Sequence, residues 1–274
     1  MSTFQKFAVA ALAAFVFGNV QAGTISDGYN GATGSGDSLG GSTYDIQSAT
    51  ITRVGNVLKI AITTGYAGKA GSASVNGVTL GYGDLFLSNA WNPAGTAADR
   101  YATDNLANSG TLWKYGLNID SNTTRTTGGD IKNAVVSLYQ LNAPAGKTKA
   151  SDINAANVRT TDQLLGAATN VYRNGQIDVV NTGAAIGKAA AGATAATDTN
   201  KNGTLNVGGG LVTFEIDITG TDMMNWTSFA MHWGETCQND VIEGVTGVVP
   251  EPGSIALLGL GLVGLIAARR RHTA

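Results

Sequence analysis

The 274-residue sequence has few of the residues that most catalytic and metal sites use. It contains one cysteine, Cys237, and two histidines, His232 and His272. One cysteine excludes an internal disulfide framework and any zinc site that needs two or more thiolates. Two histidines exclude most histidine-rich metal centres and most histidine-based nucleophilic chemistry. Only an enzyme that works with carboxylates alone remains open, and the sequence predicts no enzyme.

Charge is also scarce, because Asp, Glu, Lys and Arg make up 13% of the chain and the formal net charge is −2. The one dense basic run is Arg269, Arg270 and Arg271, at the end of the sequence. A protein that neutralises phosphates needs a basic patch or stripe, so nucleic acid is not an expected partner. Glycine is abundant instead, with 38 residues, and the 43% apolar content is enough for one sizeable core.

The first 22 residues have the order of a secretory signal peptide. Lys6 precedes an apolar run over 7–17, and small or apolar residues, Val20 and Ala22, stand at the positions that a signal peptidase reads. We therefore expect export through the secretion translocon and a cut by signal peptidase between Ala22 and Gly23. A buried N-terminal helix is the alternative.

The other end combines a proline-rich break, an apolar run and a basic cluster. Pro250, Glu251 and Pro252 precede the apolar residues 255–268, and Arg269 to Arg271 follow directly. About 14 helical residues rise about 21 Å, less than the roughly 30 Å of a hydrocarbon core. The pattern predicts a short single transmembrane helix with a cytoplasmic C-terminus.

The sequence VPEPGSIALLGLGLVGLIAARRR resembles the PEP-CTERM sorting signal of bacterial exported proteins. The resemblance covers about 25 residues and is carried by Pro250, Glu251 and Pro252, the Leu/Gly-rich segment and the arginine cluster. It implies that an exosortase, a membrane peptidase, recognises residues 248–274 and cuts near the triplet. The body would pass transiently through the inner membrane to the cell surface or extracellular matrix. A plain anchor that stays uncut is the alternative.

Between the two ends, residues 23–247 alternate between apolar and polar side chains, as β-strands do. Gly55 and Asn56 separate two such runs and indicate a hairpin. The expected strands are 44–54, 58–63, 84–88, 113–119, 134–141, 171–180, 211–218, 229–233 and 241–245. Residues 151–165 suggest a short helix, and 183–200 read as a long surface loop. The fold prediction is all-β: an antiparallel, jelly-roll-like β-sandwich with long Gly/Ala/Thr-rich loops.

Three stretches of the body resemble recurring segments of uncharacterised exosortase-dependent surface proteins. They are GDLFLSNAWNP from Gly83, GTLWKYGLNID over 110–120 and MHWGETCQNDVIEG over 231–244. The resemblance implies an exported β-rich domain with no assigned chemistry.

One segment has the spacing of a calcium loop. Asp198, Asn200 and Asn202 place oxygen donors at alternate positions, and Gly203 stands at the sixth position. The twelfth position, which should supply a bidentate glutamate, is Gly209. The segment therefore predicts either a calcium site without its strongest ligand or an Asx-rich turn. Beyond calcium no cofactor is expected.

Three aromatic residues, Trp91, Tyr101 and Trp226, lie in Asn/Thr/Gly-rich segments where a flat ring can stack on a sugar. They equally suit the ends of a sandwich. Glu215 and Asp217 share one face of a strand, with a spacing that glycosidases use, but a solvated polar face explains them as well.

Two further groupings have simpler readings. Asn239 and Asp240 form an oxygen-rich cluster near Glu243 that suits a capped turn better than a ligand site. His232 and Cys237 have no identified orienting partner, which argues against a Cys-His nucleophile. We therefore expect a non-enzymatic exported protein, sorted by an exosortase to the cell surface or to the exopolysaccharide and biofilm matrix. The alternative is a carbohydrate-binding module for extracellular polysaccharide, ahead of a secreted glycosidase.

Overall fold

A computed structural model describes residues 20–28, 42–75, 78–99, 101, 110–141, 196–236, 240–247 and 249–250. The expectations for most of the signal peptide, for a helix over 151–165, for a strand over 171–180 and for the membrane helix over 255–268 lie outside these residues. Within the described residues no helix has the length and apolar character needed to cross a membrane.

Nearly all of the regular secondary structure in the described part of the chain is strand. The strands are β1 (Val20–Ser26), β2 (Ile46–Val54), β3 (Val57–Thr64), β4 (Ser74–Val75), β5 (Val78–Thr79), β6 (Leu85–Ser88), β7 (Tyr115–Ile119), β8 (Ile131–Leu141), β9 (Ala196–Gly208), β10 (Leu211–Asp217), β11 (Ser228–Gly234), β12 (Val241–Gly247) and β13 (Val249–Pro250). Short helical turns are α2 (Asn122–Arg125) and two 3₁₀ turns, Ala97–Asp99 and Asp222–Asn225.

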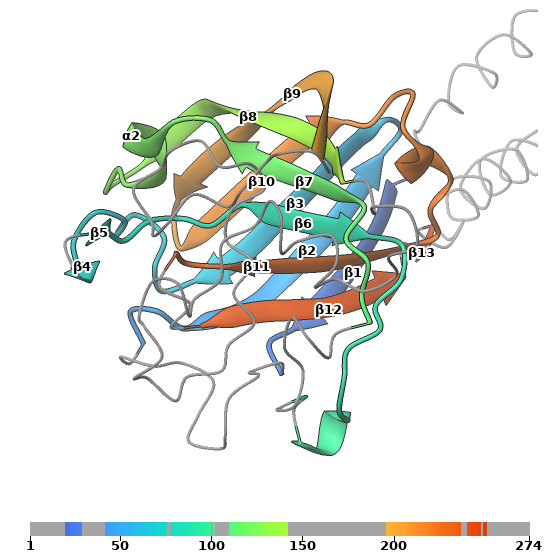
Figure 1. The fold of residues 1–274 in the computed structure, drawn as a ribbon, viewed down its shortest axis with the longest axis horizontal. Helices are drawn as coiled ribbons and strands as arrows, with labels where there is room; N and C mark the ends of the chain where they lie inside the picture. The colour runs from blue at the N-terminus through green and yellow to red at the C-terminus, as the bar shows by residue number, and fades with distance from the viewer. Residues whose placement is uncertain are drawn as a thin grey trace, which may run out of the picture.

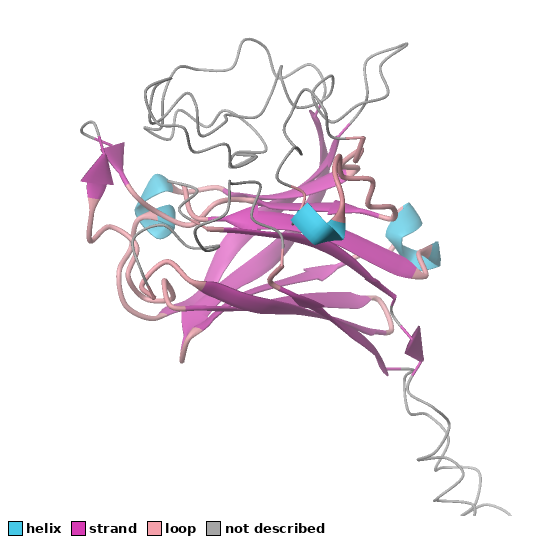
Figure 2. Ribbon diagram, turned by 90° about the horizontal axis from the view of Figure 1, so that it is seen from below, coloured by secondary structure: helices cyan, strands magenta, loops and turns pink. Residues whose placement is uncertain are grey.

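Eleven strands form one continuous antiparallel sheet in the order β12-β11-β6-β7-β8-β9-β10-β3-β2-β1-β13, and β4 pairs with β5 separately. The all-β, antiparallel prediction is therefore confirmed, but the strand pairing gives one curled sheet in place of two jelly-roll sheets (Figures 1 and 2). Register shifts occur in β2 between Ile46 and Ser48, in β8 between Ile131 and Ala134, and in β9 opposite Leu138 and Tyr139. Bulges of this kind bend a strand and increase its twist, which lets one long sheet fold over its own core.

The curl brings β12 against β1, close to the other end of the sheet order. A side chain on Gly244 would place its Cβ 2.7 Å from Ile25 Cγ2, and one on Gly23 would come within 2.6 Å of the Gly247 carbonyl oxygen. Real Cβ atoms do not approach this closely, so both glycines are needed for the contact. The sheet thus nearly closes on itself.

The hairpin predicted around Gly55 and Asn56 is formed by β2 and β3, with Gly55 at φ +58°. Along β3, Leu58, Ile60 and Ile62 are buried and the residues between them are more exposed. The same alternation on β10 places Val212, Phe214 and Ile216 in the core. In this half of the sheet one face packs inside and the other faces solvent.

The strands β6, β7, β11 and β12 depart from this alternation. Every residue of β6 and β7 is buried, as is every residue of β11 after Ser228 and the first four residues of β12. Leu85, Leu87 and Met231 belong to the main core. Phe86 and Ala230 point to the opposite face, where they form a second apolar cluster with Trp113 and Leu141.

Strand β9 was not predicted, because residues 183–200 read as a loop and 198–205 as a calcium loop or turn. The structure places Ala196–Gly208 in a 13-residue strand between β8 and β10. Leu205 and Val207 supply its buried side chains. Tertiary pairing on both sides overrides the turn propensity of its Asp and Asn residues.

Candidate functional site

A buried acid–base pair lies on the second face of the sheet. The register between β11 and β12 sets His232 opposite Glu243, and His232 Nδ1 lies 2.6 Å from Glu243 Oε2. The histidine is fully buried and the glutamate is 4% exposed. In the neutral imidazole, Nδ1–H donates to the carboxylate and Nε2 keeps a lone pair.

The second oxygen of this carboxylate fixes an aromatic pair. Trp91 Nε1 donates to Glu243 Oε1 at 2.8 Å, and the ring of Trp91 meets the edge of Tyr101 at a centroid distance of 4.8 Å. Both rings are partly exposed. The structure therefore brings together two of the three predicted stacking residues and anchors them to Glu243.

The backbone around Trp91 is held by the segment that precedes β7. Asn92 N donates to Thr111 Oγ1 at 2.8 Å, and Gly110 N donates to the Asn92 carbonyl at 2.9 Å. A Cβ on Gly110 would lie 3.0 Å from that carbonyl oxygen, so the two segments approach closely. Trp91 thus projects from a fixed segment at the end of β6.

The remaining nitrogen of the histidine lies in an aromatic environment. The His232 ring packs edge-on against Phe86, with ring centroids 6.0 Å apart. It also packs against the tilted ring of Trp113, with centroids 5.9 Å apart. His232 Nε2 is buried and has no hydrogen-bond partner among the described residues. In the part of the chain that the structure describes, no group of three or more His, Cys, Asp or Glu could hold a metal ion. We call His232, Glu243, Trp91 and Tyr101 the His232 cluster.

The third predicted stacking residue, Trp226, lies in the main core with 5% of its surface exposed. Its ring contacts Phe229 at 5.2 Å and Tyr115 at 5.9 Å between centroids. Lys114 Nζ lies 5.6 Å from the ring centroid. The prediction that Trp226 stacks on a ligand is therefore wrong, because its faces are covered by the sheet's own side chains.

The predicted calcium ligands Asp198, Asn200 and Asn202 lie on β9 and not on a separate loop. Asp198 Oδ1 accepts a hydrogen bond from Asn200 N at 2.7 Å, and Asn200 has a φ of +55°. This is the Asx turn of the alternative reading, placed where the β8–β9 register shifts. Calcium binding at these residues stays a prediction.

The carboxylates Glu215 and Asp217 both lie on the solvent face of β10, as predicted. Hydrogen bonds from the Thr219 hydroxyl and backbone N–H lower the pKa of Asp217. A glycosidase acid needs a raised pKa, so Asp217 does not have the property of the acid of such a pair.

Asp240 does not share a site with Glu243. Its two oxygens accept hydrogen bonds from Ile46 N at 2.7 Å and Val241 N at 2.9 Å, and its own N–H donates to Glu235 at 3.3 Å. This buried carboxylate thus joins the turn before β12 to the start of β2. Asn239 and Cys237 lie outside the described residues.

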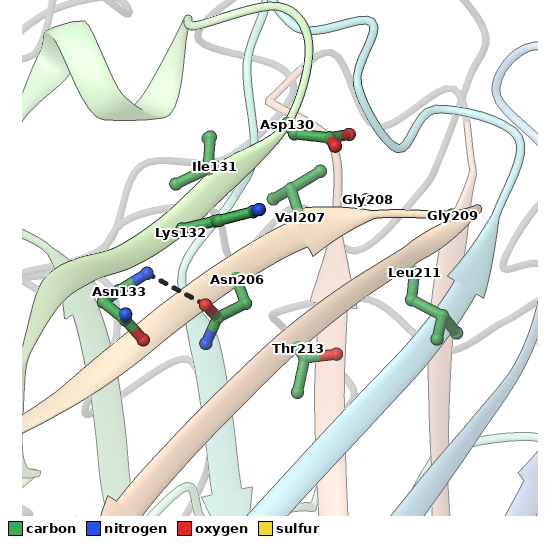
Figure 3. A pocket seen from close by; sticks show the side chains of 10 residues that line it. All are labelled: Asp130, Ile131, Lys132, Asn133, Asn206, Val207, Gly208, Gly209, Leu211 and Thr213. Atoms are coloured by element: carbon green, nitrogen blue, oxygen red, sulfur yellow. Dashed lines mark hydrogen bonds between the residues drawn. The ribbon is translucent and has the colours of Figure 1, made fainter.

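A shallow hollow of about 350 Å³ lies where β8 and β10 begin and β9 ends (Figure 3). Asp130, Lys132, Asn206 and Thr213 are among the residues that line it. Asn133 N donates to Asn206 Oδ1 at 2.9 Å, and Asn133 has a φ of +52°. No sequence signal marked this hollow, because the bulge between Ile131 and Ala134 that forms it depends on the partner strand.

The predicted processing positions meet at one edge of the sheet. Ala22 pairs with Val249 and Gln21 pairs with Pro250, so the predicted signal-peptidase site and the start of the triplet lie on adjacent strands. Figure 1 shows β1 and β13 at the same side of the molecule. Glu251, Pro252, Arg269, Arg270 and Arg271 lie outside the described residues.

The structure defines an all-β domain in which β1 and β13, the first and last of the described strands, pair at one edge of the sheet. Residues 248–271 match the PEP-CTERM protein-sorting motif, which marks exported proteins that an exosortase sorts at the membrane to the cell surface. The resemblance of the C-terminal sequence is thereby confirmed. Comparisons with curated proteins and with solved structures give no match to this chain.

Proposed function

We propose that this chain is the precursor of a non-enzymatic protein of the cell surface or exopolysaccharide matrix. A translocon exports it, signal peptidase removes residues 1–22, and an exosortase cuts near Pro250. The β-domain is then the mature product, and its role is structural or adhesive.

The observation that carries this proposal is the position of the sorting motif. The motif begins at residue 248, directly after β12, and β13 holds its first residues at the edge of the folded sheet. A cut close to the triplet therefore separates the membrane-directed segment from a domain whose core is already complete without it.

Replacement of the triplet tests the proposal. We expect a variant with Pro250→Ala, Glu251→Ala and Pro252→Ala to stay in the membrane fraction of the producing cells, whereas the wild type reaches the outer surface. The matched control replaces Glu215, an exposed residue of β10, by Ala and leaves sorting unchanged. Surface delivery of the triplet variant at the wild-type level would contradict the proposal.

Carbohydrate binding is the second candidate, and the Trp91–Tyr101 pair favours it. Glu243 holds the indole at 2.8 Å, so a partly exposed aromatic surface is fixed before any ligand arrives. A preorganised ring loses little conformational freedom when a sugar stacks on it. The ligand class would be the extracellular polysaccharide of the producing cells.

A binding assay with that purified polysaccharide tests this second candidate. We expect Trp91→Ala to weaken binding by about tenfold, the upper end of what a lost aromatic contact costs. Leu211→Ala removes an exposed apolar side chain far along the sheet order and serves as the control. Equal binding by wild type and Trp91→Ala would remove the candidate.

A further inference from the structure

Three neighbouring strands carry a row of oxygen-bearing side chains. The register sets Asn118 of β7 opposite Ser137 of β8, and Ser137 opposite Asn202 of β9 (Figure 1). Asp120 directly follows β7, two residues after Asn118. Ser137 Oγ donates to Asp120 Oδ2 at 2.7 Å and lies 3.4 Å from Asn202 Oδ1. Asn118 Nδ2 donates to Asp120 Oδ1 at 2.8 Å, so the four side chains, which we call the Asp120 group, form one connected cluster.

The buried member of the Asp120 group has an oxygen without a partner. Asn118 is 1% exposed, and its Oδ1 has no hydrogen-bond partner among the described residues. A buried amide oxygen in this state is costly, because it has lost water and gained nothing. A half-turn of the amide about its last torsion would exchange Oδ1 with Nδ2, which is directed at Asp120. Oδ1 would then face the carboxylate, and a bound cation would satisfy both oxygens.

We propose that the Asp120 group is a calcium site, in which Asp120 supplies the negative charge and the other three side chains supply neutral oxygens. Calcium takes about six to eight oxygen ligands in a flexible geometry, and carboxylate and amide oxygens are among those it prefers. Water completes the shell from the side on which Asp120 and Asn202 are exposed. Magnesium fits less well, because it demands near-ideal octahedral geometry.

The charge around the Asp120 group also favours a cation. Tyr139 lies two residues after Ser137 on β8, and therefore on the same face of that strand. Burial, together with the negative charges of Asp198, Asp120 and Asp84, raises the pKa of the Tyr139 hydroxyl. Carboxylate charge from separate segments thus converges beside Ser137, and a bound cation would offset it.

The Asp120 group differs from the calcium loop that the sequence predicts. Only Asn202 belongs to both sets, because Asp198 Oδ1 accepts its hydrogen bond from Asn200 N within the Asx turn. The register shift opposite Leu138 and Tyr139 separates that turn from Asn202. The ligands of the proposed site therefore come from three segments that the sheet brings together, and not from consecutive positions of one loop.

Titration with Ca²⁺ alone tests the proposal on the full-length protein, purified in detergent and freed of metal with EDTA. Calorimetry measures binding, and the thermal unfolding midpoint reports its effect on the fold. With a single carboxylate in the site, we expect a dissociation constant of about 10⁻⁴–10⁻³ M for Ca²⁺ and binding of Mg²⁺ that is at least about tenfold weaker. No binding of Ca²⁺ up to about 10 mM, beyond that range, would overturn the inference.

Two matched substitutions locate the site. Asp120→Asn keeps the shape of the side chain and removes its charge, so we expect Ca²⁺ to bind about tenfold more weakly or worse. Asp198→Asn is the same change on β9, and we expect a loss of about threefold at most, because Asp198 is exposed and its charge acts only from a distance. Equal losses in the two variants, or a loss confined to Asp198→Asn, would overturn the inference.

A further variant keeps the test valid if Asp120→Asn does not fold, which its unfolding curve without Ca²⁺ would show. Asn202→Ala removes one neutral oxygen from an exposed side chain at the edge of the group. We expect it to weaken Ca²⁺ binding by about threefold to tenfold and to leave the metal-free unfolding midpoint unchanged. Ca²⁺ binding at the wild-type level in this variant would overturn the assignment of Asn202 as a ligand and with it the cross-strand site.

Discussion

The two halves of the sheet differ in how many of their faces are buried. Strands β2, β3 and β10 bury one face and expose the other, as the burial of Phe214 beside the exposed Glu215 illustrates. Strands β6, β7 and β11 are buried on both faces, and buried polar groups lie on or beside them and on the neighbouring β12, including Asp84, His232 and Glu243. The first half has one solvent-exposed face, and the second half contains the polar groups that are costly to bury.

The largest effect is expected at the buried ion pair of the second half. Arg125 Nη2 lies 2.7 Å from Asp84 Oδ1, and the two side chains are 1% and 0% exposed. Asp84→Ala leaves the guanidinium without its counter-charge, so we expect a loss of about 3–5 kcal/mol in the free energy of unfolding, measured with urea.

The control for Asp84 lies in the first half. Glu215→Ala removes an exposed carboxylate on β10, and we expect a change of about 0.5 kcal/mol or less in the same measurement. Equal losses for the two variants would mean that the halves do not differ in the way proposed.

A smaller effect is expected where the halves meet. Gly244→Ala adds a Cβ 2.7 Å from Ile25 Cγ2 and should destabilise the protein by about 1–3 kcal/mol through overpacking. Gly247→Ala is the matched control on the same strand, because its Cβ would find the nearest atom at 3.9 Å. If both variants unfold at the same urea concentration as the wild type, β12 does not pack against β1 as described.

The His232 cluster should give a weaker signal. Trp91→Phe removes the donor to Glu243, and we expect a loss of about 1–1.5 kcal/mol in unfolding free energy. A double-mutant cycle with Glu243→Ala, which removes the acceptor, isolates the pair, since the two losses should not add. Strict additivity would show that the hydrogen bond contributes nothing.

The smallest effect concerns pH. Burial, together with the neighbouring Asp222 carboxylate, raises the pKa of Tyr115 to about 12, and its hydroxyl donates to Asp222 at 2.7 Å. A raised pKa stabilises the fold below the unfolded value of about 10, and this contribution is lost as the pH rises towards 12. The stability difference between wild type and Tyr115→Phe should therefore be constant below pH 10 and shrink above it. A constant difference up to pH 12 would contradict the assignment.

The first half of the sheet was the more predictable from sequence. Leu58, Ile60 and Ile62 alternate with less buried residues, and Gly55 and Asn56 mark a two-residue turn, so local pattern sufficed for β2 and β3. Local pattern failed for β9, where Asp198 and Asn200 favour turns and only the flanking β8 and β10 impose a strand. No local signal in the sequence predicts that β6 pairs with β11, with Leu87 opposite Met231.

The candidate site was predictable only in part. Trp91 and Tyr101 were selected as exposed aromatics, and the structure places them together. The pairing of His232 with Glu243 was missed, although the antiparallel pairing of β11 with β12 sets these two residues opposite each other. The burial of Trp226 was not predictable, because it depends on Tyr115 and Phe229 from separate strands.

The most direct test of the account is the intact mass of the protein recovered from the outer surface of the cells that produce it. We predict a chain that begins at Gly23 and ends near Pro250 to Pro252, without the apolar segment 255–268 and Arg269 to Arg271. A surface species that retains this C-terminal segment would contradict exosortase sorting, whatever its N-terminus.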